Sequence, residues 1–370
     1  MRVEVVDPSA YTPPYDHALC AALARAGADV RLVTSRFAYG DTTALPGYEI
    51  DERFYRLARG GAGSRGRRAA KALEHVPDML AYRRRAPGTA DVVHFQWLTM
   101  QWIDGHLLPR SVPVVLTSHD LLPREARAGQ ARAQRRLYER VDAVVVHSQY
   151  GRSQLVGALG VDPARVHVIH HGAFAHLAAL PPAPLEPSLA AVKRPVVLFF
   201  GLLRPYKGLE TLLEAWRGVD GAELWIVGRP RMELPPDLLR PGVRVVPRFV
   251  SDPELAGFFR RADMVVLPYS RTERLDFSGV LATALTFGRA IVVSDVGGLG
   301  EVAAQGAARL VAPDDPAALH AALVELIDDP DARERLGAGA LAAAAGPYSW
   351  DTAARQTLAL YRSLGAGDGL

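Results

Sequence analysis

The sequence predicts an α/β protein with two domains, each built on a doubly wound parallel β-sheet. Its length of 370 residues exceeds one ordinary domain and suits two of about 150 to 200 residues. In both halves, short apolar segments end in polar residues and are followed by helical periodicity, a rhythm typical of parallel sheets flanked by helices. Residues 173–194 are rich in proline and lack periodicity, which indicates a semi-rigid linker between the halves.

The first domain is expected over residues 1–172. Its predicted strands cover residues 3–6, 30–33, 91–94, 112–117, 143–146 and 166–169, and its predicted helices cover residues 16–26 and 69–82. In the second of these helices, Leu73, Val76 and Leu80 share one face at helical spacing.

Histidines follow four of the predicted strands, and they are His94, His119, His147 and His171. Because the connections in such sheets share one handedness, the strand ends meet at one edge, and the four side chains should lie along one rim. A single histidine is most often structural, and that alternative stays open for each. The first turn, residues 8–16, lacks a G-x-G-x-x-G pattern, which disfavours a bound dinucleotide and therefore a dehydrogenase.

The second domain is expected over residues 195–348, followed by a closing segment at 349–370. Predicted strands cover residues 196–200, 224–227, 243–246, 264–267, 290–293 and 310–311. Helices are expected at 209–216, between Ser278 and Gly288, at 316–327 and at 349–364. A capping box at Ser251 and Glu254 opens a further helix that extends to Arg261.

A strand, a turn and a helix follow one another in residues 196–216. The apolar strand ends at Gly201, and leucines at i, i+3 and i+4 mark a helix from Leu209. Arg204 and Lys207 stand in the turn between them. Ligands of open parallel sheets bind at this edge, where a helix N-terminus adds partial positive charge. The two cations are therefore predicted to hold a phosphate or diphosphate, the alternative being two solvated loop cations.

Residues 276–301 form a second informative stretch. Ser278 and Gly279 open a short helix that is apolar nearly all round, and hence buried, and Gly288 stops it. A buried strand then ends in Ser-Asp-Val-Gly-Gly and leads to Glu301. Together with residues 195–208, this stretch resembles the nucleotide-sugar half of glycosyltransferase family 4, whose members have the GT-B fold.

The resemblance covers most of the chain and is specific in the second half. It implies two Rossmann-like domains that face a cleft, with the donor in the second domain, the acceptor against the first, and the closing helix crossing back to the first. It also implies transfer from a nucleoside-diphosphate sugar with retention of anomeric configuration. No D-x-D run stands near the motifs, so we expect no metal, and no cofactor besides the donor substrate.

The chain departs from the family pattern in the donor motif. Aligned on Phe277, the two motif glutamates fall on Leu275 and Thr283. The second glutamate usually holds the ribose hydroxyls, and Thr283 can replace only one of its contacts. The arginine of the family motif also lies two positions later in the sequence than usual, at Arg204. These departures concern the identity of the donor and leave the fold unaffected.

The resemblance also assigns residues to sites. The expected donor-binding residues are Gly201, Arg204, Lys207, Arg248, Phe249, Val250, Asp276, Phe277, Ser278, Gly279, Val280 and Thr283, with the nucleobase near residues 248–250. The expected acceptor-binding residues are Tyr15, Asp16, Gln96, Trp97 and His119. Catalytic contributions are expected from His119, His94, Arg204 and Lys207, without one of them being named as the base.

The amino-acid composition argues against several other classes of protein. A hydrophobic content of 49% with 22% charged residues describes a protein with an ample core, and a net charge of +3 is too slight to indicate a nucleic-acid partner. Cys20 is the single cysteine, which excludes a disulfide framework and a cysteine-based zinc site. No signal-peptide pattern and no apolar run of about 18 residues is visible, so we expect a cytoplasmic protein.

Residues 53–85 concentrate positive charge, with ten cations against two carboxylates, a local charge of +8. The cations are Arg53, Arg56, Arg59, Arg65, Arg67, Arg68, Lys71, Arg83, Arg84 and Arg85. One interpretation is a solvated helix packed on the sheet behind a mobile loop. The other is a basic lid that attracts an anionic acceptor or an anionic membrane surface. The acceptor itself, whether a small molecule, a glycan or a lipid-linked group, is left open.

Two other functions share these features. A nucleotide-sugar epimerase or phosphorylase of the same fold would use the same phosphate site. A non-catalytic two-lobed protein that binds a nucleotide sugar is the second alternative, and the missing glutamate pair keeps it open.

Overall fold

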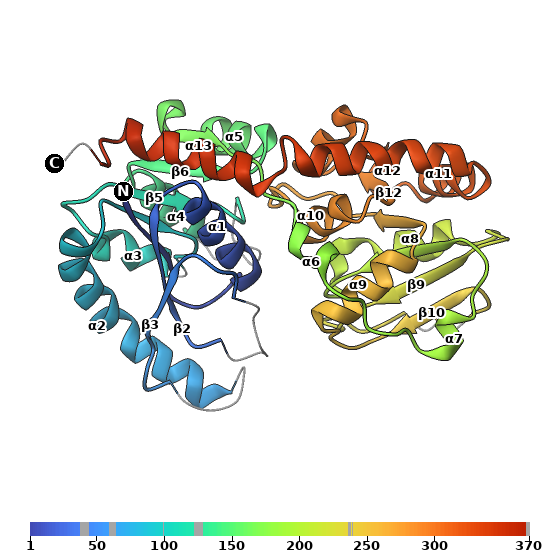
Figure 1. Cartoon of the computed structure of the whole chain (residues 1–370), viewed down its shortest axis with the longest axis horizontal. Coiled ribbons are helices and arrows are strands. Elements are labelled where there is room, and N and C mark those ends of the chain that lie inside the picture. Colours follow the sequence, from blue (N-terminus) through green and yellow to red (C-terminus); the bar gives the residue numbers. More distant parts are fainter. Residues whose placement is uncertain are drawn as a thin grey trace. The chain divides into compact units, whose positions relative to one another are not determined.

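The computed structural model of the protein describes residues 1–37, 44–58, 64–98, 100–121, 129–235, 238 and 240–367. The chain forms two compact units, one of residues 1–172 with 350–370 and the other of residues 173–349. Each unit is a parallel sheet flanked by helices (Figure 1). This confirms the predicted fold class. The apolar strands form the two sheets, and the helices that connect them along the chain flank those sheets.

The described strands of the first unit form one seven-stranded parallel sheet in the order β3-β2-β1-β4-β5-β6-β7. They are β1 (Arg2–Asp7), β2 (Asp29–Ser35), β3 (Glu49–Phe54), β4 (Val92–Phe95), β5 (Val114–Thr117), β6 (Ala143–Val146) and β7 (Val166–Val168). The helices are α1 (Pro13–Arg25), α2 (Arg65–Thr89), α3 (Gln101–Leu107), α4 (Gln130–Tyr138), α5 (Gln149–Ser153) and α13 (Trp350–Ser363).

The described strands of the second unit form a six-stranded parallel sheet in the order β10-β9-β8-β11-β12-β13. They are β8 (Val196–Phe200), β9 (Glu223–Val227), β10 (Val243–Val246), β11 (Met264–Leu267), β12 (Ala290–Ser294) and β13 (Arg309–Val311). The helices are α6 (Ala175–Ala179), α7 (Pro187–Ala190), α8 (Leu209–Ala215), α9 (Asp252–Arg261), α10 (Gly279–Thr286), α11 (Pro316–Asp328) and α12 (Pro330–Ala345), with 3₁₀ turns at Pro205–Lys207 and Leu299–Gln305.

Several of these elements are absent from the sequence prediction, among them the strand β3 and the long helix α12. β3 lies at the edge of its sheet, where mostly polar and partly exposed residues give no apolar run. α12 is alanine-rich and has no clear apolar stripe. Its start is marked only by Asp329, whose side chain accepts the Ala332 N–H at 2.8 Å.

The face of α2 that packs on the sheet differs from the expected one. Leu73 is 79% exposed, whereas His75, Met79 and Tyr82 are buried. The helix also continues through Pro77 and on to Thr89. Of the apolar residues predicted to share one face, Leu80 packs against the core, whereas Leu73 and Val76 are exposed. A buried histidine and a buried tyrosine complete the packed face, and each brings its own hydrogen-bond partner.

Residues 173–194, expected as a linker, lie within the second unit and pack on α9. The Arg260 guanidinium donates to the backbone oxygens of Ala178 and Leu180 at 2.7 and 2.9 Å. Arg261 donates to the backbone oxygens of Val192 and Arg194, both at 2.8 Å. The backbone carbonyls of this proline-rich segment are not all used in regular secondary structure, and these two arginines donate hydrogen bonds to them.

The helix α13 lies along α1 of the first unit, although more than 300 residues separate them (Figure 1). An ion pair of 2.7 Å joins Arg25 to Asp351. At the same junction, a Cβ on Gly172 would lie 2.3 Å from the Trp350 ring, so only glycine permits this close packing.

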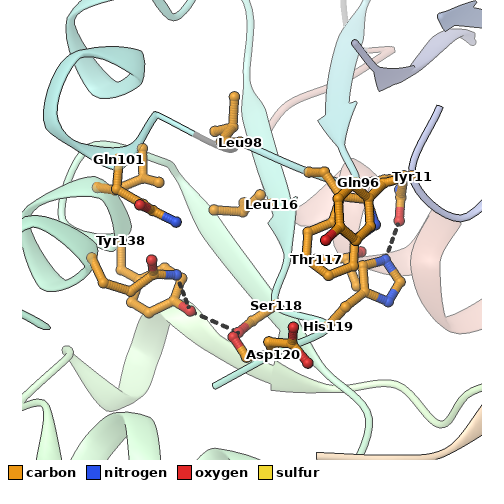
Figure 2. Close-up of a pocket in the computed structure, with 13 residues that line it drawn as sticks. Tyr11, Gln96, Leu98, Gln101, Leu116, Thr117, Ser118, His119, Asp120 and Tyr138 are labelled. Atoms are coloured by element: carbon orange, nitrogen blue, oxygen red, sulfur yellow. Dashed lines mark hydrogen bonds between the residues drawn. The ribbon is translucent and has the colours of Figure 1, made fainter. Parts of the chain in front are cut away.

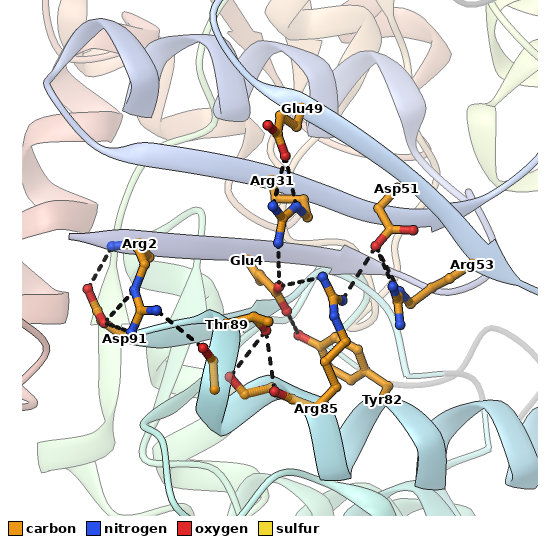
Figure 3. A network of polar contacts seen from close by, with 12 residues as sticks. Arg2, Glu4, Arg31, Glu49, Asp51, Arg53, Tyr82, Arg85, Thr89 and Asp91 are labelled. Atoms are coloured by element: carbon orange, nitrogen blue, oxygen red, sulfur yellow. Dashed lines mark hydrogen bonds and ion pairs between the residues drawn. The ribbon is translucent and has the colours of Figure 1, made fainter.

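Several arginines of the basic segment form a structural network around Glu4, a carboxylate of β1 that is 1% exposed (Figure 3). Glu4 accepts a hydrogen bond of 2.8 Å from the Tyr82 hydroxyl and pairs with Arg31 and Arg85 at 3.4 and 3.5 Å. A buried carboxylate needs such partners, since an unpaired one would cost several kcal/mol. Arg85, and likewise Arg53 through Asp51 at 2.7 Å, therefore serve the fold. Arg59 lies outside the described residues.

Candidate functional site

The turn after β8 is fixed to the loop after β11. Gly208 has a φ of +70°, and a Cβ there would lie 1.7 Å from the backbone oxygen of Pro268, so only glycine fits. The Tyr206 carbonyl accepts the Ser270 N–H at 2.9 Å. Two strand-end loops are thus locked together at the edge of the second sheet, where ligands of such sheets bind.

Lys207 lies at the centre of this edge. Its ammonium group donates to the Tyr269 hydroxyl at 2.7 Å, and that hydroxyl lies 2.9 Å from Ser278 Oγ. A Cβ on Gly201 would lie 3.3 Å from the ammonium nitrogen, so the missing side chain leaves room for an approaching group. A lysine in a turn between strand and helix, with its ligand absent, is expected to be exposed, and for Lys207 this expectation is wrong. It is only 5% exposed, because its ammonium group is hydrogen-bonded to the Tyr269 hydroxyl.

Arg204 is half-buried in the same turn. Among the residues that the structure describes, none forms a hydrogen bond or ion pair with its guanidinium group. A cation without a carboxylate partner at a ligand-binding edge is available to an anion. Arg204 therefore offers a planar guanidinium group that no described residue holds, whereas Lys207 offers a buried ammonium group that Tyr269 holds in place.

The start of α10 is held by the loop after β12. The Gly298 N–H donates to the Asp276 carbonyl at 2.9 Å, and a Cβ on Gly297 would lie 2.2 Å from the backbone oxygen of Leu275. Phe277 stacks on Tyr348 with ring centroids 5.7 Å apart. Asp276 is fully buried, so its carboxylate is not exposed to meet a donor in the way that was predicted. Gly279 and Val280, in contrast, are accessible at the helix start.

Thr283 turns its hydroxyl back into its own helix. Its Oγ1 donates to the Gly279 carbonyl at 2.9 Å, and the residue is 5% exposed. A hydroxyl used this way keeps only acceptor capacity for a ligand. At the expected nucleobase position, Phe249 is 68% exposed, Val250 is buried, and Arg248 pairs with Glu254 at 2.7 Å. The Arg248 hydrogen bond lowers the pKa of Glu254 to about 2.

In the first unit, three of the four strand-end histidines gather on one rim, as predicted. The His119 and His147 rings are 5.3 Å apart, and so are those of His147 and His171. Tyr15 packs against all three at 4.6 to 5.4 Å. These rings pack in a row, tilted or edge-on to one another. Within the described ranges no three His, Cys, Asp or Glu side chains are arranged to hold a metal ion.

Burial keeps this row uncharged near neutral pH. It lowers the pKa of His147 to about 4 and that of His171 to about 3. Burial, reinforced by the neighbouring histidines, lowers the pKa of His119 well below its usual range. The rim therefore presents neutral imidazoles, which can donate or accept a hydrogen bond but supply no positive charge.

His94 does not share this rim in the way that was expected. It is 1% exposed, and its Nδ1 and Nε2 lie 2.6 Å from the Tyr361 hydroxyl and 2.8 Å from Thr117 Oγ1. Both ring nitrogens are hydrogen-bonded within the unit, an arrangement typical of a structural histidine, and its catalytic contribution stays a prediction. The cause of this arrangement is α13, which carries Tyr361 onto the strand end.

A cavity of about 350 Å³ opens beside His119 at the ends of β4 and β5 (Figure 2). Gln96, Trp97 and His119 line it, as expected for acceptor residues. Trp97 stacks on His119 with centroids 5.0 Å apart and an interplanar angle of 14°. His119 Nε2 lies 3.3 Å from Gln96 Oε1. The three residues thus form one connected wall of the cavity.

Two predicted acceptor residues do not line this cavity. Tyr15 is buried among the histidines, and Asp16 is 1% exposed, with its carboxyl hydrogen-bonded to that of Asp7. Burial, followed by the charge of Asp7, raises the pKa of Asp16 well above its usual range. Both residues are buried on α1, and their acceptor contacts stay a prediction.

Other lining residues were missed by the sequence prediction. Tyr11 and Ser118 stand next to predicted strand ends, so a search of every such loop could have found them. Gln134 and Tyr138 lie on α4, an amphipathic helix that the sequence analysis did not predict. In the second unit, Tyr269 was missed as the partner of Lys207, although it follows β11 directly.

Comparison with known proteins agrees with this architecture. A family model described as Glycosyltransferase Family 4 matches residues 15–173, and one described as Glycosyl transferases group 1 matches residues 194–329. The chain is 34% identical over 316 residues to D-inositol 3-phosphate glycosyltransferase 1 of Catenulispora acidiphila, covering 75% of this chain and 73% of that protein. It is 31% identical to the enzyme of the same name from Nocardioides sp. over 321 residues, covering 74% and 68%.

Solved structures show the same fold. Sucrose-phosphate synthase from Thermosynechococcus elongatus superposes with a TM-score of 0.76 at 20% identity, covering 99% of both chains. Anabaena HepE in complex with UDP-glucose gives 0.72 at 18% identity, covering 98% of this chain and 100% of that one. Two parallel-sheet units of this kind define the GT-B fold. The chain belongs to glycosyltransferase family 4, as its motifs predicted.

Proposed function

We propose that the second unit binds a nucleoside-diphosphate sugar and that the first unit binds the hydroxyl acceptor. The observation that carries the donor half is the fixed position of Lys207, joined through Tyr269 to Ser278 at the start of α10. Arg204 adds a guanidinium group with no partner among the described residues. Two cations and a helix N-terminus stabilise a diphosphate leaving group without rearranging during the reaction. The names of the neighbours, which include complexes with UDP-glucose, support this class of donor.

We propose transfer with retention and without a metal. The bond between the anomeric carbon and the diphosphate oxygen breaks, and the acceptor oxygen forms its bond on the same face of the sugar. The acceptor proton passes to the departing phosphate, so the step needs no external base. His119 then orients the acceptor and does not remove its proton, which agrees with a neutral imidazole hydrogen-bonded to Gln96.

The deciding experiment incubates the full chain with a panel of nucleotide sugars and measures release of free nucleoside diphosphate. A glycosyltransferase releases nucleoside diphosphate slowly without an acceptor and faster with one. If no metal is required, EDTA leaves this rate unchanged. An epimerase converts the sugar, and a phosphorylase requires phosphate. A binding protein shows affinity with no turnover at all, which would refute the proposal. Proton NMR of the product then distinguishes retention from inversion.

A second proposal concerns membrane attachment through α2. Arg65, Arg68 and Arg84 are exposed, and so is Leu73 on the same helix. Leu57 is 75% exposed nearby, with its N–H bonded to Glu74 of α2 at 2.8 Å. Exposed basic and apolar side chains on and beside one helix favour an anionic bilayer, to which each cation adds about 1 kcal/mol. The described helices are all too short or too polar to cross a bilayer, so any contact through this surface would be peripheral.

A further inference from the structure

The pairing of β8 with β9 continues past the ends of both strands. Leu203 forms a parallel bridge with Pro230, in the same register as the ladder between the two strands. The Leu203 N–H donates to the Arg229 carbonyl at 3.0 Å, and the Arg231 N–H donates to the Leu203 carbonyl at 2.9 Å. The turn after β9 is therefore fixed alongside the turn after β8, which carries the two cations of the candidate phosphate site.

This register sets pairs of residues side by side in the two turns. Leu202 lies beside Arg229, and Arg204 lies beside Arg231, at the spacing of about 4.8 Å that separates neighbouring strands. Leu203 is 0% exposed, so the residues on either side of it, which alternate along extended backbone, point away from the core. Arg229 and Arg231 are accordingly exposed, and Leu202 is 38% exposed. The outward face of the two turns thus brings three arginines together.

Like charges gathered on one small face repel one another unless an anion lies between them. Among the residues that the structure describes, none forms a hydrogen bond or an ion pair with the guanidinium group of Arg204, Arg229 or Arg231. Glu233, a described carboxylate that follows closely in the sequence, forms no ion pair with them. A diphosphate relieves the repulsion, because its oxygens accept hydrogen bonds from several guanidinium groups at once.

Arg229 stands next to the open space at Gly201. A Cβ on Gly201 would lie 3.3 Å from the Lys207 ammonium nitrogen and 3.0 Å from the side chain of Val280, at the start of α10. Leu202 follows Gly201 directly, and Arg229 is the residue that the register sets beside Leu202. The long side chain of Arg229 can therefore reach the same space that the Lys207 ammonium group borders.

We infer that Arg229 is a third cation of the donor phosphate site and binds the diphosphate together with Arg204 and Lys207. The inference rests on the proposed function in taking the anion to be the diphosphate of a nucleotide sugar. A guanidinium group binds phosphate through two parallel N–H···O bonds, so Arg229 adds orientation as well as charge at the leaving group. The turn after β9, which the sequence analysis did not assign to the donor, is then part of the donor site.

The test is a calorimetric titration of the full chain with UDP, GDP, ADP and dTDP, continued with the nucleotide that binds most tightly. Arg229→Ala should weaken the binding of that nucleotide about tenfold, whereas Arg217→Ala, which removes an exposed arginine after α8, should leave it unchanged. Equal affinity in the Arg229→Ala variant and the natural protein would overturn the inference and leave the proposed function standing. Binding of none of these nucleotides at millimolar concentration would overturn both.

A relocated arginine gives a second measurement. Because Leu202 lies beside Arg229 on the same face, Leu202→Arg in the Arg229→Ala background should restore most of the lost affinity. Gln305→Arg in that background is the control, since Gln305 is exposed shortly before β13 begins, at the opposite edge of the sheet, and the change adds the same charge there. No recovery with Leu202→Arg, or equal recovery with both changes, would overturn the inference. Thermal melting checks that each variant is folded.

Discussion

The ammonium nitrogen of Lys207 lies 2.7 Å from the hydroxyl oxygen of Tyr269. Through that hydroxyl and Ser278, the turn after β8 is joined to the start of α10. The lysine is therefore both a candidate ligand contact and a tie between loops, and these two roles can be separated by mutation.

Replacing either cation of the phosphate site should weaken nucleoside-diphosphate binding. Each charge-assisted bond is worth roughly 1.5–3 kcal/mol, so Arg204→Ala and Lys207→Ala should each cost about tenfold to a hundredfold in affinity. Only Lys207→Ala should also lower the free energy of unfolding, by about 1–3 kcal/mol, because it removes the hydrogen bond that the ammonium group donates to the buried Tyr269 hydroxyl. Calorimetry and urea titration measure the two effects. Arg217→Ala, an exposed cation after α8, is the control. Unaltered affinity in both variants would refute the site.

Thr283→Val should have a small effect on donor binding, below about 1.5 kcal/mol or roughly tenfold. The Thr283 hydroxyl already donates to the Gly279 carbonyl, so the ribose must find its main contacts elsewhere. A calorimetric loss well beyond tenfold would show that Thr283 is a principal ribose contact.

His119→Ala should reduce sugar transfer far more than it reduces donor affinity, because His119 belongs to the cavity wall of the first unit. His94→Ala should act differently. It removes partners from Tyr361 and Thr117 and should lower stability by about 2–4 kcal/mol with a proportionate loss of activity. Steady-state kinetics and melting temperature distinguish the two patterns. A His119→Ala protein whose activity falls only with its melting temperature would assign His119 a structural role.

The buried histidines predict loss of stability on acidification. Their folded pKa values of about 3 to 4 lie below the ordinary 6.5, so below pH 6.5 the unfolded chain takes up protons that the folded chain excludes. Stability is then full above pH 6.5 and falls towards pH 4 by about 1.4 kcal/mol per pH unit for each histidine. Urea titrations at pH 7, 6 and 5 measure the slope. His171→Gln should reduce the slope of stability against pH by the contribution of one histidine. An unchanged slope would contradict the low folded pKa assigned to His171.

Membrane attachment should depend on Arg65, Arg68 and Arg84. The triple change to Gln should abolish sedimentation with vesicles of anionic lipid, and binding by the natural protein should fall steeply with salt. Arg83 and Arg85 are unsuitable targets, because they bond to the His106 carbonyl and to Glu4. Arg217, Arg229 and Arg231, exposed on the second unit, form the matched control triple. Equal recovery with neutral and anionic vesicles would refute the proposal.

The sequence predicts elements better than it predicts which side chains face a ligand. Apolar strands such as β8 and β11 are visible because burial on both faces leaves a continuous apolar run, and glycines such as Gly208 mark turns that only they can make. His94 and His119 look alike in sequence, since both stand at strand ends. What separates them is Tyr361, a residue that only folding brings to His94.

The same limit applies to charge. Arg84 and Arg85 are neighbours in the sequence, yet one is exposed and the other pairs with a buried glutamate from β1. Lys207 was expected at the surface, and Tyr269 draws it inward. Motif spacing finds the cations, but their partners come from distant strands and cannot be found by local pattern alone.

The return of α13 to the first unit has a consequence for biosynthesis. The tyrosine that bonds to His94 is 267 residues further along the chain, so a ribosome adding about 5–20 residues per second emits it roughly 10–50 s later. Through that interval the whole second unit emerges and can fold, while Tyr15 and His171 await the Trp350 ring that covers them. The unit that is synthesised first is thus the unit whose packing is completed last.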